Sequence, residues 1–350
     1  MTAVGVWRWS LIRILPFALA IGALTVAIYQ LIESSSHPFA AEHATVRVLS
    51  YSAFVASWGP GPEIARRFYE QTGMNLEFQE ADDAGLLLRK LEIFPADVVL
   101  GFDQLTLDQA RAARPWRSVS SIVQSYAETE NLRRWSEPDF LVFDWAPLSF
   151  VYRKGEVEPP RSFADLLDSR FKAAIALEDP RTSTPGLQFM FWVLDEMGIE
   201  EGFAYLKSIQ PQLQSVSASW STAYGLFTQK QAKLAFSYET SPIYHEVEEK
   251  NFQYAVAVFD AGHVAQFEYA GIPTSCDNCS GAEAFLKFLV QPEIQKIIMQ
   301  KNNMFPVLAK LIDGTPFEHV PKVTLHLWKN LPELLKRRDE LLKRWQEIGM

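Results

Sequence analysis

Two kinds of hydrophobic pattern alternate along most of the chain. Short runs rich in β-branched and aromatic residues predict strands, and they lie at 46–51, 75–79, 97–101, 140–143, 148–152, 173–177, 233–238 and 254–259. Apolar residues at helical spacing predict helices between them, at 63–72, 187–197 and 281–290. Strands that alternate with helices are typical of an α/β fold with mostly parallel sheets. We therefore expect that fold class here.

The C-terminal stretch predicts one charged amphipathic helix over residues 332–348. Its apolar residues have helical spacing and are expected to pack on the body of the protein; they are Leu334, Leu335, Leu341, Leu342 and Trp345.

The N-terminus carries a long apolar run. Arg8 and Arg13 precede residues 14–32, which contain no charge, and this length is close to the roughly 20 residues that span a bilayer. A basic flank followed by an apolar run indicates an export signal. Either a cleaved signal peptide or an uncleaved membrane anchor fits residues 1–43, and both give a periplasmic protein. No cysteine lies directly after the run, which excludes attachment as a lipoprotein.

Composition narrows the classes of function. The chain has 33 Lys and Arg against 42 Asp and Glu, a net charge of −9. Nucleic-acid binding normally needs a basic excess, so a nucleic-acid partner is excluded. Hydrophobic residues make up 48%, which rules out disorder as the main state. Aromatic residues, at 13%, are numerous enough to predict stacking surfaces as well as core.

The two cysteines, Cys276 and Cys279, have C-x-x-C spacing. In an exported chain this spacing favours a structural disulfide. A redox pair or half of a metal site remains an alternative, although no second pair completes a zinc site.

Five segments run from a strand or loop into a helix start that carries small, polar or proline residues. They lie at 51–62, 97–103, 178–186, 217–221 and 238–242. Each such start presents free backbone N–H groups, which favour an anion. In open α/β sheets ligands bind at these ends of the strands. Because tyrosine and tryptophan are interleaved with the starts, the pattern predicts a cleft for an aromatic ligand with an anionic group.

The same segments resemble periplasmic substrate-binding proteins of ABC importers, and within them the thiamine-binding branch. The resemblance covers about residues 46–310. Its most specific strings are Asp179-Pro-Arg-Thr-Ser-Thr-Pro-Gly-Leu187 and Trp220-Ser-Thr-Ala-Tyr-Gly-Leu-Phe227. Weaker strings include 51–62, 96–103 and 237–245.

This resemblance implies a two-lobed periplasmic-binding-protein fold of type II, with a hinge between the lobes. It places a first lobe at 44–147, a second at 148–265, and a return to the first at 266–350 with the C-terminal helix. It also implies a monomer that binds thiamine or a thiamine phosphate between the lobes and delivers it to a membrane permease. No catalytic residue, metal ion or cofactor is expected.

The resemblance also implies a set of ligand-binding residues, namely Tyr51, Trp58, Gly101, Asp103, Ser183, Trp220, Tyr238 and Tyr244. A flat aminopyrimidine and a cationic thiazolium suit aromatic walls. The donors expected for a phosphate tail are Ser183 Oγ, Trp220 Nε1–H and the Tyr238 hydroxyl.

Two positions depart from the pattern of that branch. Ser52 stands where an aspartate follows the first tyrosine, and Asn303 stands where a pocket tryptophan occurs. The first change removes a counter-charge and the second removes a stacking face. A relative of thiamine is therefore an alternative ligand.

Other functions stay open at the level of sequence. Tyr238, Tyr244 and His245 are similar to the Tyr/His ligands of ferric-ion-binding relatives. A thiaminase-like enzyme would need a thiolate in the cleft beside a carboxylate, but the two cysteines occur late in the chain and in an expected disulfide. An adhesion role would leave the helix starts without a purpose. His245 and His263 are expected to be surface or hydrogen-bonded residues rather than ligands.

Overall fold

The structure is a computed structural model that describes residues 45–81, 83–125 and 130–350. The expected signal or anchor, residues 1–43, lies outside the described residues. Within the described part of the chain, no helix combines the length and the apolar character needed to cross a bilayer.

The described strands form one mixed sheet in the order β2-β1-β3-β9-β4-β7-β5-β6, with β8 and β10 paired to β4. Their bounds are β1 Thr45–Tyr51, β2 Asn75–Ala81, β3 Val98–Asp103, β4 Leu141–Arg153, β5 Ile175–Glu178, β6 Leu213–Ser217, β7 Leu234–Tyr238, β8 Tyr254–Val256, β9 Ala265–Gly271 and β10 Phe305–Pro306. The pairings β1–β2, β1–β3, β5–β6 and β5–β7 are parallel. Every described pairing of β4 and β9 is antiparallel. The expectation of mostly parallel sheets is therefore wrong, because two central strands run against their neighbours.

Strand β4 joins the two parallel parts of the sheet. The sequence predicts two strands here, at 140–143 and 148–152, but the structure has one strand of 13 residues. Its first half, through Pro147, pairs with β9, and its second half, from Leu148, pairs with β7. Asp144 and Pro147 interrupt the apolar pattern at the point where the pairing changes, which explains why the sequence suggests a gap.

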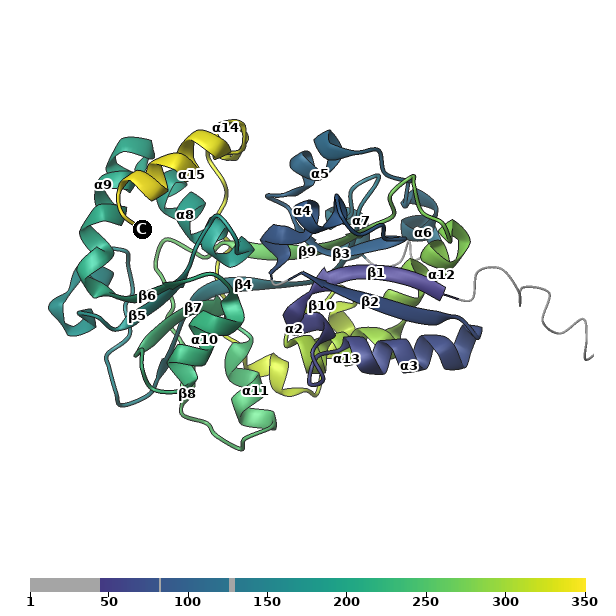
Figure 1. The fold of residues 1–350 in the computed structure, drawn as a ribbon. Helices are drawn as coiled ribbons and strands as arrows, with labels where there is room; N and C mark the ends of the chain where they lie inside the picture. The colour runs from purple at the N-terminus through teal and green to yellow at the C-terminus, as the bar shows by residue number, and fades with distance from the viewer. Residues whose placement is uncertain (1–44, 82, 126–129) are drawn as a thin grey trace, which may run out of the picture. The chain divides into compact units, whose positions relative to one another are not determined.

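The helices cover the two parts of the sheet. Their bounds are α2 Ser52–Val55, α3 Gly61–Thr72, α4 Leu87–Leu91, α5 Leu107–Ala113, α6 Ser120–Ser125, α7 Glu130–Trp135, α8 Thr184–Met197, α9 Ile199–Ile209, α10 Trp220–Thr228, α11 Ser241–Val247, α12 Cys279–Leu289, α13 Pro292–Asn302, α14 Leu331–Lys336 and α15 Arg338–Glu347. Figure 1 shows α3 and α12 beside β1 and β2, and α8 and α9 beside β5 and β6.

Two large hydrophobic cores follow from this layout. The first core contains buried side chains of β1, β3, α3, α12 and α13, and the second contains those of β5, β7, α8 and α9. Strand β4 serves both: Leu141 packs in the first core, and Leu148 and Phe150 pack in the second. The two cores are thus connected by a strand that belongs to each.

The C-terminal amphipathic helix is two helices, α14 and α15, which meet at Arg337. Their apolar residues do pack on the body, as the spacing predicts. The sequence-based division groups residues 266–350 with the first lobe, whereas the side chains of Leu334, Leu341 and Trp345 are buried in the second core. After residue 320 the chain therefore returns to the second core.

Candidate functional site

A cavity of about 380 Å³ lies where the two parts of the sheet meet. Its lining comes from the ends of β1 and β7, from β9, from the starts of α2, α8, α10 and α11, and from the end of α13. Several of the helix starts singled out in the sequence therefore converge on one cavity. Tertiary contact between the two halves of the chain is needed to enclose it.

Five of the predicted ligand-binding residues line this cavity: Tyr51, Trp58, Trp220, Tyr238 and Tyr244. Trp58 and Tyr244 lie at the surface, with 54% and 41% of their area exposed, while Tyr51 is buried. The Trp220 indole N–H donates to Ser237 Oγ at 2.8 Å. The Tyr238 hydroxyl accepts a hydrogen bond from Gln266 Nε2 at 2.9 Å. The Trp220 donor is thus engaged inside the protein, whereas the Tyr238 hydroxyl accepts rather than donates in its contact with Gln266.

Three predicted residues do not line the cavity. Gly101 has φ +113°, and a Cβ at this position would come within 2.4 Å of the Tyr51 ring, so this glycine makes room for a cavity residue. Asp103 is fully buried and accepts a hydrogen bond from Gln188 Nε2 at 2.9 Å. Ser183 is the N-cap of α8 and is buried, and the cavity is lined by the next residue, Thr184.

One wall of the cavity is a stack of aromatic rings that the sequence analysis only partly predicted. Trp220 stacks on Tyr224 at 5.2 Å between ring centroids. The Tyr224 hydroxyl lies 2.9 Å from His245 Nε2, and His245 Nδ1 lies 2.7 Å from Glu249. Burial lowers the pKa of His245. The ring is therefore neutral at pH 7, with Nδ1–H donating to Glu249 and Nε2 accepting from Tyr224. His245 is a hydrogen-bonded residue that orders this wall.

A second group, here called the carboxyl cluster, consists of Tyr51, Asp144, Glu268 and Asn302. The Tyr51 hydroxyl donates to Glu268 at 2.5 Å. Asn302 Nδ2 donates to Asp144 at 2.7 Å and to the Tyr51 hydroxyl at 2.9 Å. Burial, reinforced by the charge of Glu268, raises the pKa of Asp144 well above its ordinary value. Burial likewise raises the pKa of Glu268.

A third group, here called the helix-start cluster, consists of Asp83 and the backbone N–H groups around it. The Asp83 carboxylate accepts hydrogen bonds from the N–H of Trp220 at 3.2 Å and of Gly85 at 3.5 Å. Trp220 begins α10, so a carboxylate of the protein occupies one of the helix starts that the sequence assigned to an external anion. Burial raises the pKa of Asp83 to about 6, although the backbone hydrogen bonds oppose this shift.

Sequence reasoning missed Asp83, Glu268, Gln266 and Asn302 as cavity residues. A signal for two of them exists in 265–271, where polar Gln266 and Glu268 alternate with apolar residues as in a strand with one polar face. No strand was predicted there. Asn302 directly precedes Asn303, which the sequence analysis already places at a pocket position, so a signal for it existed. Asp83 lies in a segment without a distinctive pattern, so only the folded chain brings it to the cavity.

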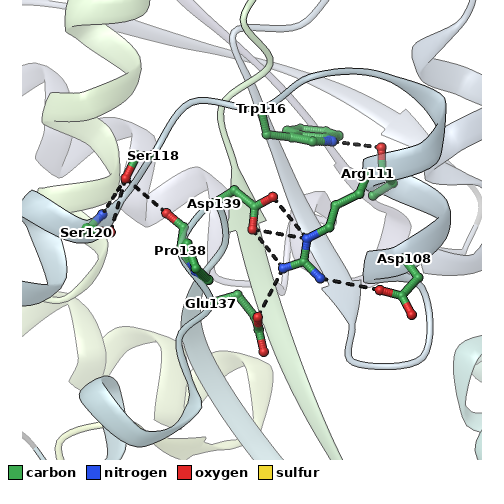
Figure 2. A network of polar contacts seen from close by, with 9 residues as sticks. Asp108, Arg111, Trp116, Ser118, Ser120, Glu137, Pro138 and Asp139 are labelled. Carbon is green, nitrogen blue, oxygen red and sulfur yellow. Dashed lines mark hydrogen bonds and ion pairs between the residues drawn. The ribbon is translucent and has the colours of Figure 1, made fainter. Parts of the chain in front are cut away.

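A second hollow, of about 330 Å³, lies beside Arg111 and Trp116. Figure 2 shows the Arg111 guanidinium surrounded by Asp108, Glu137 and Asp139. Its shortest contact is 2.7 Å, to Asp139. The Trp116 indole N–H donates to the backbone of Ala110 at 2.8 Å. Because these donors already have acceptors, this hollow offers little to a ligand, and we interpret it as a structural network.

The structure joins Cys276 and Cys279 in a disulfide. It lies at the start of α12, where Asn278 caps the helix by accepting from the N–H of Gly281 at 3.0 Å. Among the described residues, no group of three or more His, Cys, Asp or Glu side chains is arranged to hold a metal ion. His263, the other histidine considered in the sequence, is buried and accepts from the N–H of Phe259 at 2.9 Å.

Comparison with known proteins gives a consistent result. The family model described as "Bacterial extracellular solute-binding protein" matches residues 97–323. The chain is 34% identical over 304 residues to the thiamine-binding periplasmic protein of Salmonella typhimurium, which covers 85% of this chain and 91% of the relative. It is also 34% identical over 305 residues to the thiamine-binding periplasmic protein of Escherichia coli K12, with the same coverage.

A solved structure titled "Periplasmic thiamin binding protein" superposes with a TM-score of 0.80 at 32% identity. The match covers 87% of this chain and 96% of that one. The arrangement of strands and helices described above is therefore the α/β periplasmic-binding-protein fold, and the chain belongs to the bacterial extracellular solute-binding protein family.

Proposed function

We propose that this protein captures thiamine or a thiamine phosphate in the cavity and delivers it to the permease of an ABC importer. The observation that carries the proposal is the composition of the cavity wall. Aromatic rings from Trp58, Trp220, Tyr238 and Tyr244 occur together with buried carboxyl groups, including Glu268. A thiazolium cation gains roughly 0.5–2 kcal/mol over an aromatic ring. Nearby carboxylates add attraction for its charge.

The acidic residues of the cavity compensate for the missing aspartate at Ser52. That position lacks the aspartate seen in the thiamine-binding branch, but Asp83, Glu249 and Glu268 all line the cavity. The negative charge that a cation needs is thus supplied from other strands and helices. This favours thiamine over a neutral relative.

A tail on the ligand would meet the start of α8. Thr184 lines the cavity and is buried, and its Oγ1 has no hydrogen-bond partner among the described residues. We assign to Thr184 the role in tail binding that the family resemblance implies for Ser183. The preference of the cavity for thiamine or for a thiamine phosphate then depends on competition between the ligand tail and the nearby Asp83 carboxylate.

In this proposal, the two lobes that contain the two cores move relative to each other when the ligand is taken up and released. We place a first lobe at about 44–147 and 266–320 and a second at 148–265 together with the C-terminal helices. Strands β4 and β9 connect them as the hinge of a type II binding protein. The protein acts as a monomer in the periplasm, where its relatives are named to occur, and residues 14–32 direct its export.

Two rival functions have less support. A thiaminase-like enzyme needs a thiolate nucleophile, but the only two cysteines of the sequence are joined to each other. For ferric iron, the candidate ligand His245 already donates from Nδ1 to Glu249 and accepts from Tyr224 at Nε2. The relatives of this chain are named as binding proteins. We therefore treat this chain as a binding protein.

The test is calorimetry on purified protein stripped of ligand by mild unfolding and refolding. We expect saturable, one-to-one binding of thiamine, its monophosphate or its diphosphate, without turnover. Choline, a cation that lacks the aromatic rings, should bind much more weakly. Absence of heat and of a thermal shift with all three thiamine compounds would refute the assignment of ligand.

A further inference from the structure

Asp144 and Glu268 are two buried carboxyl groups held together by one amide. Asn302 Nδ2 lies 2.7 Å from Asp144 Oδ2 and 3.5 Å from Glu268 Oε2. Their exposed areas are 0% and 3%. Within the described residues, neither carboxyl group forms an ion pair or hydrogen bond with a lysine or arginine. The donors that reach the pair, Asn302, Tyr51 and Gln266, are neutral.

Two carboxylates in such a site cannot both be ionised at modest cost. Burial penalises each charge, and the two charges repel each other. Neutral hydrogen-bond donors compensate only part of this energy. The pair therefore needs one positive charge, which is either a proton on one of its oxygens or a cation in contact with it.

The cavity supplies an independent indication of a ligand at the pair. Glu268 and Gln266 both line the cavity. Gln266 is 1% exposed, and its Oε1 has no hydrogen-bond partner in the described part of the chain. Its Nε2 donates to Glu268 Oε1 at 3.3 Å, so the amide is oriented beside the pair. A buried acceptor without a donor, next to a carboxyl pair without a cation, fits a cationic ligand that carries N–H groups.

We propose that the Asp144–Glu268 pair is the counter-ion of the ligand, holding one shared proton in the unliganded protein and releasing it when a cationic, N–H-bearing ligand binds beside Glu268 and Gln266. Only an O–H bond breaks, and the proton passes to the solvent. The inference rests on the proposed function and specifies which group of the cavity recognises the cation. It predicts that ligand affinity rises with pH, because the proton and the cation compete for one pair.

Several other titratable groups lie on the elements that surround the carboxyl pair. They are Tyr51 of β1, Asp83, Asp103 of β3, Tyr238 of β7 and Lys301 of α13. Burial keeps both tyrosines protonated at neutral pH by raising their pKa. Lys301, near the end of α13, is exposed. The pH dependence above pH 6 is therefore assigned to the pair.

The first measurement is infrared spectroscopy of the unliganded protein at pH 7. A carboxylic-acid C=O band should be present and should disappear in Glu268→Gln. Asp144→Asn serves as the second variant in case one of them fails to fold. Glu178→Gln is the matched control, because Glu178 is buried to the same degree but does not line the cavity. The carboxylic-acid band of the pair should be lost in a pair variant and retained in Glu178→Gln. If neither pair variant loses such a band, the pair holds no proton and the proposal is overturned.

The second measurement is titration with thiamine, which carries no phosphate proton. The difference spectrum on binding should show loss of the same carboxylic-acid band. Calorimetry in buffers of different ionisation enthalpy should report release of about one proton at pH 6.5, and Glu268→Gln should abolish the release and weaken binding by about 10- to 100-fold. Binding without loss of the band overturns the inference but leaves the proposed function intact. Absence of thiamine binding refutes the proposed function, and the unliganded spectrum still decides whether the pair holds a proton.

Discussion

The carboxyl cluster and the helix-start cluster both place an acidic side chain at the cavity, yet they stabilise its ionised form to different extents. Asp83 accepts backbone N–H groups from Trp220 and Gly85. Asp144 receives one side-chain amide and faces a second carboxyl group. The pKa of Asp83 is raised only to about 6, whereas that of Asp144 is raised well above its ordinary value.

The difference shows that burial alone does not decide the ionisation state. Both residues are buried, and burial is the largest cause of the pKa shift in each. Backbone N–H groups at a helix start stabilise the charged form of Asp83. A neighbouring carboxyl group opposes the charged form of Asp144. At neutral pH the helix-start cluster therefore carries a negative charge, while the carboxyl cluster is where we propose a retained proton.

The largest expected effect is on the stability of the unliganded protein as a function of pH. Burial raises the pKa values of Asp83 and Asp103 from 3.8 to about 6. Between these values the folded state binds more protons than the unfolded state, so the free energy of unfolding falls as pH rises from about 4 to 6. Each shift corresponds to about 3 kcal/mol. We expect the melting temperature to drop by on the order of 10 °C across this window.

Variants separate the two clusters in this experiment. Asp83→Asn should flatten the decline between pH 4 and 6, and Asp144→Asn should flatten it above pH 6. Below about pH 4 the slope should reverse, because Arg66 and Arg67 lower the pKa of Glu63 to about 2. A melting temperature that rises steadily from pH 4 to 7 would contradict the assignment of both clusters.

The next effect concerns the contact of Asp83 with α10. Asp83 lies beside Ala84 of the first core, whereas Trp220 begins a helix that packs on β5 and β7. Asp83→Ala therefore removes a hydrogen bond to a charged group between the two sides of the cavity, which costs about 1.5–3 kcal/mol. Thiamine affinity should fall by about one to two orders of magnitude in calorimetry.

Ser219→Ala is the matched control for that helix start. Ser219 caps α10 by accepting from the N–H of Thr222 at 3.3 Å, a contact within one side of the cavity. Its loss should reduce the free energy of unfolding by about 1 kcal/mol while thiamine affinity stays unchanged. Equal losses of affinity in the two variants would show that Asp83 acts only as a helix cap.

A smaller effect is expected for the aromatic wall. Tyr244 is 41% exposed, and a cation–π contact at such a site contributes about 0.5–1 kcal/mol. Tyr244→Ala should weaken thiamine and its phosphates alike, by about two- to fivefold, because ring stacking does not depend on the tail. A loss of affinity confined to the thiamine phosphates would indicate that Tyr244 contacts the tail of the ligand instead.

The smallest effect is expected at Asn303. This residue ends α13 with φ +54°, a left-handed conformation that asparagine tolerates better than most residues. Asn303→Trp adds a ring to the cavity lining but should lower the free energy of unfolding by about 1 kcal/mol or more. We expect a gain in thiamine affinity of a few-fold at most. An unchanged affinity would indicate that the added indole points away from the ligand.

The sequence was most informative where local pattern and final structure depend on the same residues. Strands β1 and β2 and helix α3 match the predicted segments closely because their apolar periods reflect burial on one face. Strand β9 was not predicted, although Gln266 and Glu268 alternate there with apolar residues as in a strand with one polar face. Those polar residues line the cavity, so the alternation that marks the strand also gives it a role.

By itself the sequence determined the α/β class, the family resemblance and most of the aromatic wall, since Trp58, Trp220, Tyr238 and Tyr244 occur in recognisable strings. Only the tertiary structure decided the polarity of the cavity. Asp144 and Glu268 are 124 residues apart in the sequence, and neither belongs to a motif. They meet because β4 and β9 pair in antiparallel register, with Asp144 opposite Glu268. The energy of a buried charge depends on such neighbours, which a local pattern cannot specify.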